Sequence, residues 1–490
     1  MQMIFPYPSR LEEKNGTYPC GKEVYLTVDD SFRHPGFEEM AAELWGNFTG
    51  GLSTLRVVRI PGDTHTAMLS NTAVLLTSAE TEEDYELTVD KNGARFIFGS
   101  PAGLMHGFYT LLQLLPPFRR HEGNAPLPFV AVADHPALGF RALDISVFHG
   151  ESFHFLRRMI RLAALLKYTH VQLEFWGSLE FACCPAASWE GAFTQEEIKM
   201  LVKEGTALGI EFIPFFNHYG HASMARFRTG KHVFLDQAPE MADMFLPGGW
   251  TWDVTNPAVE MLHRSIREEL CALFPGKYFH MGCDEVFNEN GFIDPYDKAE
   301  NDAYVAHINR CADAICRMGR TPIMWADMLL DGGKFRYPFT GNYSHRASDS
   351  DRNLPRIDER LILCDWQYEI NGDKPETLDY LLQYRPAEKL LTAPWHKLDN
   401  IEGRAMLAKE KGLMGMIDTT WDLVHKEVRS VSYAACGAWE QDMRYCRTCS
   451  GELMTVRTME LLRKLLPCGG DFKDAGVFDH EIDAIVGTVG

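Results

Sequence analysis

Short apolar runs separated by turn residues fill the first part of the chain. They are Glu23–Val28, Ser53–Ile60, Ala73–Leu76, Tyr85–Val89 and Ala94–Gly99. Apolar runs bounded by turn signals are typical of strands. After Pro101 and Gly103, residues Leu104–Leu115 follow a helical apolar period. The pattern predicts a small α/β domain with a mostly antiparallel sheet over residues 1–135, and a loop at Pro116–Pro128 that ends it.

From Phe140 onward, strand patterns alternate with helical ones. The strand candidates are Arg141–Ile145, Thr169–Phe175, Glu211–Phe216, Lys277–Met281, Thr321–Trp325, Leu361–Trp366, Leu390–Thr392 and Gly415–Ile417. Between them lie amphipathic stretches, and Thr194 with Glu197 forms a capping-box sequence that predicts a helix through Ala207. Strands that alternate with helices in this way predict a closed (β/α)8 TIM barrel over residues 136–490 rather than an open doubly wound sheet. No glycine-rich phosphate loop follows the first strand, so nothing local supports nucleotide binding.

Composition and charge narrow the expected partners. The chain has 490 residues with a formal net charge of −20, and 46% of its residues are hydrophobic. The acidic balance argues against nucleic acid and against an anionic membrane surface. The first eight residues lack the pattern of a secretory signal, no apolar stretch is long enough to span a membrane, and several cysteines lie in apolar runs, so we expect a cytoplasmic protein. The sequence does not specify the oligomeric state, and a homodimer is left open.

Two adjacent carboxylates, Asp284 and Glu285, follow the strand candidate Lys277–Met281. Catalytic groups of a (β/α)8 barrel lie where strands end. Neighbouring side chains of an extended strand point in opposite directions, but both can reach one cleft where the chain bends. Two carboxylates in one pocket separate in pKa, which is the division of roles that glycoside cleavage needs. The alternative for this dipeptide alone is a solvated helix start.

Four tryptophans lie at or just after late strand candidates. They are Trp325, Trp366, Trp395 and Trp421. Indole faces suit the C–H faces of a pyranose and can enclose an acetamido methyl group. Filling the core is the alternative for any one of them, but four at successive strand ends favour a sugar pocket.

Taken together, these motifs resemble glycoside hydrolase family 20, the β-N-acetylhexosaminidases. His280–Val286 resembles the family pattern H-x-G-G-D-E-V, with Cys283 in place of one glycine. Further similar segments are Gly103–Leu115, Asp134–Asp144, Ile213–Ala222, Trp252–Pro257 and Thr419–Asp422. The resemblance covers most of the chain. It implies an exo-glycosidase that acts on a carbohydrate with a terminal β-linked GlcNAc or GalNAc.

The resemblance also implies a mechanism and roles. The substrate's own 2-acetamido carbonyl would attack the anomeric carbon and give an oxazolinium intermediate with net retention. Asp284 would accept the acetamido N–H, and Glu285 would act first as general acid and then as base. Arg141 would bind hydroxyls at the non-reducing end, although a structural ion pair is the alternative. His221 would tune Glu285, and Asp422 would bind a sugar hydroxyl.

Some positions depart from the family pattern. The family usually has a tyrosine that donates to the acetamido oxygen, whereas Thr392–Asp399 contains none. Tyr368, Tyr343, Trp395 or His396 could supply this donor. Glu174–Gly177 replaces an H-x-x-D-D segment, and Asn217 replaces an aspartate. These changes leave the preference between gluco- and galacto-configured sugars open.

We expect neither a metal nor a cofactor. His218 and His221 are three residues apart and Cys446 lies three residues before Cys449, but no further ligands accompany either pair at metal spacing. Two alternative functions remain. One is a non-catalytic carbohydrate-binding relative, and the other is a barrel glycosidase for a sugar without the acetamido group, with Asp284 or another carboxylate as a covalent nucleophile.

Overall fold

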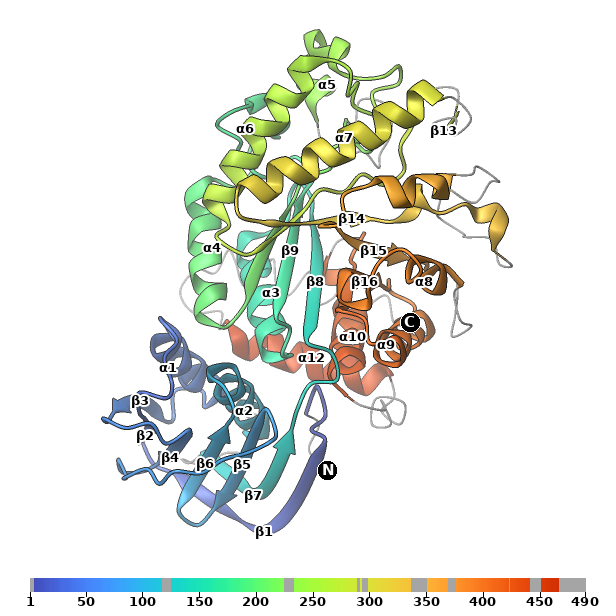
Figure 1. Cartoon of the computed structure of the whole chain (residues 1–490). Coiled ribbons are helices and arrows are strands. Elements are labelled where there is room, and N and C mark those ends of the chain that lie inside the picture. Colours follow the sequence, from blue (N-terminus) through green and yellow to red (C-terminus); the bar gives the residue numbers. More distant parts are fainter. Residues whose placement is uncertain are drawn as a thin grey trace.

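The computed structural model describes residues 4–116, 125–223, 233–288, 291–292, 298–335, 350–368, 376–422, 424–440 and 451–466. Figure 1 shows a small N-terminal domain, in blue, beneath a larger barrel. The polypeptide passes from the last strand of the N-terminal sheet, β7 (Ala125–Asp134), into the first barrel strand, β8 (Phe140–Val147). The predicted fold class, a (β/α)8 barrel preceded by an α/β domain, is confirmed.

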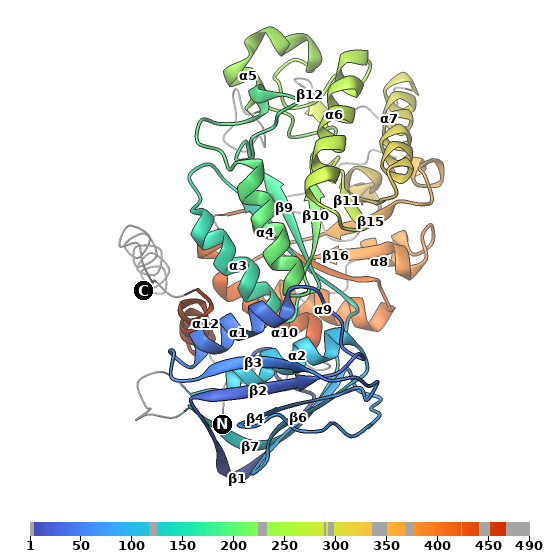
Figure 2. The ribbon, with the colours of Figure 1, turned by 90° about the vertical axis from the view of Figure 1, so that its left-hand side faces the viewer.

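The N-terminal sheet has seven strands in the order β1-β7-β5-β6-β4-β2-β3, and only β2 and β3 pair in parallel. The other strands of this sheet are β1 (Arg10–Cys20), β2 (Glu23–Val28), β3 (Thr54–Arg59), β4 (Thr66–Ser70), β5 (Tyr85–Asp90) and β6 (Gly93–Phe98). Helices α1 (Phe37–Phe48) and α2 (Pro101–Leu114) lie between the sheet and the barrel (Figure 2). Ala73–Leu76 is not a strand, and Leu75 is 89% exposed.

All eight predicted barrel strands are present, and they close in the order β10-β11-β14-β15-β16-β17-β8-β9. After β8 come β9 (His170–Phe175), β10 (Glu211–Phe215), β11 (Tyr278–His280), β14 (Thr321–Trp325), β15 (Ile362–Trp366), β16 (Leu390–Ala393) and β17 (Gly415–Asp418). Each barrel pair is parallel. The loops that follow the strands therefore meet at one end of the barrel, where catalytic groups of this fold collect.

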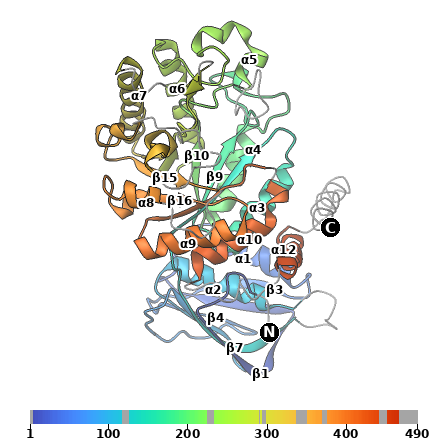
Figure 3. The ribbon, with the colours of Figure 1, turned by 90° about the vertical axis from the view of Figure 1, so that its right-hand side faces the viewer.

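Helices cover the outside of the barrel (Figures 2 and 3). They are α3 (Phe153–Leu165), α4 (Gln195–Ala207), α6 (Pro257–Leu273), α7 (Lys298–Arg317), α8 (Glu376–Leu381), α9 (Leu398–Lys411), α10 (Val428–Trp439) and α12 (Gly451–Leu465). The short α5 (Phe234–Gln237) lies at the top of the view in Figure 2, in the connection that follows β10. The capping box of Thr194 and Glu197 opens α4 as predicted. In the part of the chain that the structure describes, no helix has both the length and the apolar character of a membrane span.

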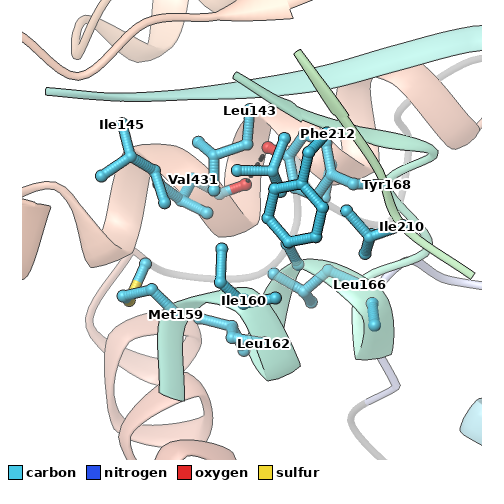
Figure 4. Close-up of a cluster of buried hydrophobic side chains, with 14 of the residues drawn as sticks. Leu143, Ile145, Met159, Ile160, Leu162, Leu166, Tyr168, Ile210, Phe212 and Val431 are labelled. Carbon is cyan, nitrogen blue, oxygen red and sulfur yellow. Dashed lines mark hydrogen bonds between the residues drawn. The ribbon is translucent and has the colours of Figure 1, made fainter. Parts of the chain in front are cut away.

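Apolar side chains pack between the first barrel strand, β8, and helix α3 (Figure 4). Leu143 and Ile145 of β8 face Met159 and Ile160 of α3, and all four are buried. The hydroxyl of Tyr168 lies in the same cluster and donates a hydrogen bond to the Val431 carbonyl oxygen at 2.8 Å. This bond joins the segment between α3 and β9 to α10.

Candidate active site

A sharp turn follows β11 and carries the two carboxylates. Gly282, Cys283 and Glu285 adopt φ values of 64°, 68° and 48°. Left-handed backbone at a residue other than glycine is strained by about 1–3 kcal/mol and persists only where the surroundings hold it. The turn breaks the alternation of an extended strand, so two consecutive side chains can face the same space.

Asp284 and Glu285 both face His221. The Nε2 atom of His221 lies 3.3 Å from Asp284 Oδ2 and 3.0 Å from Glu285 Oε2. The side chains of the two acids are 8% and 15% exposed. The imidazole packs against the indole of Trp250, with ring centroids 4.2 Å apart. One nitrogen thus bridges two nearly buried carboxyl groups and can stabilise charge on either of them.

Asn217, which follows β10, fixes the turn from the other side. Its Nδ2 donates to Asp284 Oδ1 at 2.5 Å, and its Oδ1 accepts the Cys283 N–H at 2.9 Å. The loop after β10 also approaches the turn closely, because a β-carbon added to Gly220 would lie 2.1 Å from the Asp284 carbonyl oxygen. The asparagine that replaces the family's aspartate therefore orients Asp284 and adds no negative charge.

A third carboxyl group, that of Asp327, was not predicted. It opens η4 (Asp327–Leu329), just after β14, and is 1% exposed. Burial and the nearby Asp284 and Glu285 raise the pKa of Asp327 well above its usual range. The sequence signal for it is a carboxylate two residues beyond the strand β14, at the strand end where Trp325 had been expected to contact a sugar.

Aromatic side chains continue the site around the barrel from β15 to β17. The hydroxyl of Tyr368 accepts a hydrogen bond from Trp421 Nε1 at 2.7 Å. The Tyr368 ring lies 5.1 Å from Trp366 and 5.4 Å from Trp395. Burial raises the pKa of the Tyr368 hydroxyl well above 10, so it stays protonated. The structure thus brings Trp366, Trp395 and Trp421 together around one tyrosine hydroxyl.

Trp325 differs from the other three tryptophans and corrects the prediction. It is 0% exposed and packs between His280 and Trp421, at centroid distances of 4.4 and 5.9 Å. A fully covered indole offers no face to a ligand in this structure. We therefore assign Trp325 to the floor beneath the aromatic side chains rather than to sugar contact.

Arg141, which was expected to bind sugar hydroxyls, lies elsewhere in the structure. It lies near the start of β8, so it is at the amino end of the barrel, opposite the catalytic end. Its Nε donates to the Lys167 carbonyl oxygen at 2.8 Å, and its Nη1 donates to the Leu138 carbonyl oxygen at 2.8 Å. Burial lowers the pKa of Arg141 to about 10, although Asp84 and Asp134 oppose the shift. Arg141 therefore holds chain segments together and is remote from the acid pair.

The remaining predicted residues lie in different surroundings. Asp422 is exposed, whereas Glu427 contacts the aromatic side chains, because its Oε1 accepts from Trp395 Nε1 at 3.0 Å. His218 turns its Nδ1 to the Phe216 carbonyl oxygen and is fully buried. Tyr343, Cys446 and Cys449 lie outside the described residues.

A separate pocket of about 620 Å³ lies along the connection between β9 and α4. Trp189, Glu190 and Gln195 are among its lining residues, and Gln237 of α5 closes one side. Asp284 and Glu285 do not line it. The acid pair and the aromatic side chains Trp366, Trp395 and Trp421 therefore lie outside this pocket.

Family models match both parts of the chain. A model of the catalytic domain of glycosyl hydrolase family 20 matches residues 165–365, and a model of domain 2 of that family matches residues 1–135. A beta-hexosaminidase of Porphyromonas gingivalis is 25% identical over 369 residues, which cover 67% of this chain and 46% of that protein. A beta-N-acetylhexosaminidase of Cellulomonas fimi is 23% identical over 351 residues, with 66% of each chain covered.

Solved structures show the same architecture. An exo beta-N-acetylglucosaminidase of Vibrio harveyi, solved with N-acetylglucosamine, has a TM-score of 0.67 at 14% identity and covers 94% of this chain and 77% of that one. A beta-N-acetylhexosaminidase of Bacteroides fragilis has a TM-score of 0.64 at 15% identity, covering 94% and 96%. The chain spans 46% of the P. gingivalis relative and 23% of a lacto-N-biosidase of Bifidobacterium bifidum. With both models matched and the barrel in place, the chain belongs to glycosyl hydrolase family 20.

Proposed function

We propose that this protein is a retaining exo-glycosidase that removes terminal β-linked N-acetylhexosamine, GlcNAc or GalNAc. One observation carries the proposal: two consecutive carboxyl groups lie within 3.3 Å of a single histidine nitrogen at the catalytic end of the barrel. Family membership and the hexosaminidase names of the relatives point the same way.

The geometry favours different roles for the two acids. Asp284 is held by Asn217 and is the more buried, so it suits a fixed charge that accepts the acetamido N–H and stabilises the oxazolinium cation. Glu285 is more exposed and suits proton exchange with the leaving oxygen and then with water. His221 contacts both and can compensate as negative charge moves between them.

The aromatic side chains supply the acetamido pocket in this proposal. Trp366, Trp395 and Trp421 surround Tyr368, whose hydroxyl already accepts from the Trp421 indole. Thr419 Oγ1 also donates to this hydroxyl, at 3.4 Å, so both of these contacts use the Tyr368 oxygen as acceptor and neither uses its proton. A protonated hydroxyl of this kind can donate a hydrogen bond to the acetamido oxygen. The family usually has a tyrosine for this contact, but Thr392–Asp399 contains none, so we assign the contact to Tyr368.

A comparison of four substrates tests the function. The nitrophenyl β-glycosides of GlcNAc, GalNAc, glucose and galactose should separate into two active acetamido substrates and two inactive ones. A thiazoline analogue of the cyclised intermediate should inhibit strongly, because it resembles the charged species that Asp284 stabilises. Hydrolysis of the glucoside or galactoside without thiazoline inhibition would favour a covalent nucleophile. Absence of hydrolysis of all four would favour a carbohydrate-binding protein.

A further inference from the structure

Asp327 lies directly behind the main chain of Glu285. Its Oδ2 accepts the Glu285 N–H at 3.0 Å. Its Oδ1 makes no hydrogen bond to any residue that the structure describes. Asp327 comes from the loop after β14, whereas Glu285 follows β11, and these two strands are neighbours in the barrel. The Asp327 side chain, from the loop after β14, therefore holds the backbone of Glu285 in the neighbouring loop after β11.

The turn needs such restraint because its conformation is strained. Glu285 has a φ of 48°, and the peptide groups on both sides of it are engaged. Trp250 Nε1 donates to the Glu285 carbonyl oxygen at 2.8 Å, and Asp327 accepts the N–H. If one of these bonds is removed, the backbone can relax toward ordinary φ values. Relaxation would turn the Glu285 carboxyl away from the site it shares with Asp284.

We propose that Asp327 is a positioning residue for the general acid: it holds the Glu285 peptide in its left-handed conformation and so fixes the direction of the Glu285 carboxyl group. The inference rests on the proposed function and extends it to a residue outside the acid pair. Asp327 acts on the proton-transfer step through Glu285 and touches no substrate.

Asp327 performs this role as a neutral carboxylic acid. Three ionised carboxylates in one nearly buried site would repel one another, and His221 contacts Asp284 and Glu285. Burial and the adjacent Asp284 and Glu285 raise the pKa of Asp327 in accordance with this. A neutral carbonyl oxygen is sufficient to accept the Glu285 N–H, so an amide can replace the acid.

The test compares Asp327→Asn with Asp327→Ala. The amide keeps an acceptor of the same reach, whereas alanine removes it. Asp327→Ala should lower kcat by about 100-fold with KM changed less than about threefold, because the acid is misdirected while sugar contacts remain. Asp327→Asn should lose less than about fivefold. If the alanine variant does not fold, Asp327→Ser, which is too short to reach the N–H, takes its place.

Leaving-group dependence identifies the step that Asp327 affects. Asp327→Ala should reduce kcat for a GlcNAc disaccharide at least tenfold more than for nitrophenyl β-GlcNAc, because nitrophenolate needs little protonation. Asp331 is the matched control. It is 3% exposed, and its Oδ1 accepts the Gly333 N–H at 2.9 Å within the same loop. Asp331→Ala should lower stability with no such dependence on the leaving group.

Each outcome decides the proposal. Equal losses in the asparagine and alanine variants would mean that the Asp327 charge is required, and would overturn the neutral positioning role. An alanine variant with wild-type kcat, or with equal losses on both leaving groups, would also overturn the positioning role of Asp327. Either result would leave the proposed function unaffected. A wild-type protein inactive on all four glycosides would overturn the proposed function, and this inference with it.

Discussion

The two ends of the barrel both hold buried charges, but they balance them differently. At the amino end, Asp134 and Lys167 are both 0% exposed and lie 2.7 Å apart. Asp134 also accepts from Tyr85 at 2.7 Å and from Trp439 Nε1 at 2.9 Å. Each oxygen of this carboxylate is satisfied, and its charge is matched by a cation.

At the carboxyl end, three carboxyl groups lie close to one another, and one imidazole contacts two of them. Asp284, Glu285 and Asp327 lie together, and His221 contacts the first two. Burial and the nearby Asp284 and Glu285 raise the pKa of Asp327, which favours its neutral form. We therefore expect substitutions at the amino end to change mainly the stability of the fold and substitutions at the carboxyl end to change mainly the proposed proton transfer.

Replacement of Glu285 should give the largest effect. Glu285→Gln should lower kcat/KM on a GlcNAc disaccharide by about 1,000-fold, because the leaving oxygen loses its proton donor. The loss on nitrophenyl β-GlcNAc should be at least tenfold smaller. The free energy of unfolding should stay within about 0.5 kcal/mol of the wild type, since a charge is removed from a crowded site. Equal kinetic losses on both substrates would rule out Glu285 as the acid.

Replacement of Asp134, at the amino end, should change stability and leave the kinetics unchanged. Asp134→Ala leaves Lys167 buried without its carboxylate and should lower the free energy of unfolding by about 3–5 kcal/mol. The kcat of the folded variant should match that of the wild type. Asp379→Ala is the control, because Asp379 pairs with Lys411 at the surface and its loss should cost about 0–1 kcal/mol. Chemical denaturation and initial rates measure both, and a folded Asp134→Ala with lowered kcat would contradict the division of roles.

The sequence identified the barrel because buried parallel strands leave continuous apolar runs, such as Thr169–Phe175. It missed β1 (Arg10–Cys20), an edge strand whose residues are mostly exposed, since such a strand has little apolar pattern. The acid pair could be predicted because a motif and a strand end coincide there. Arg141 was misplaced because an arginine within a strand pattern does not indicate which end of the barrel it serves. Asp327 was missed because its role depends on a contact between two loops.

Gly220 tests how closely the loops of the catalytic end must approach. In Gly220→Ala the β-carbon would lie 2.1 Å from the Asp284 carbonyl oxygen, so the turn must shift. A shift of this kind should lower kcat by about 30- to 100-fold. Gly46→Ala in α1 is the control, because nothing lies within 4 Å of an added β-carbon there and alanine favours a helix by about 1 kcal/mol. Wild-type kcat in Gly220→Ala would show that the turn tolerates displacement.

His170 gives the smallest effect and tests the amino end by pH. Burial, and then the charges of Arg141 and Lys277, lower the pKa of His170 to about 3. Below about pH 6.5 the unfolded chain binds a proton at this imidazole, whereas the folded protein does not bind it until about pH 3. The stability of the folded protein therefore decreases as the pH is lowered from about 6.5 to about 3.

Between pH 7 and pH 5, His170→Gln should therefore lose about 2 kcal/mol less of its unfolding free energy than the wild type. His307, whose pKa burial also lowers to about 3, should contribute similarly, so the slope is reduced by the His170 variant and not abolished. Urea denaturation at several pH values measures both curves. Parallel curves would mean that His170 gains a proton in the folded state as readily as in the unfolded one, and that the amino end is less closed to protons than its packing indicates.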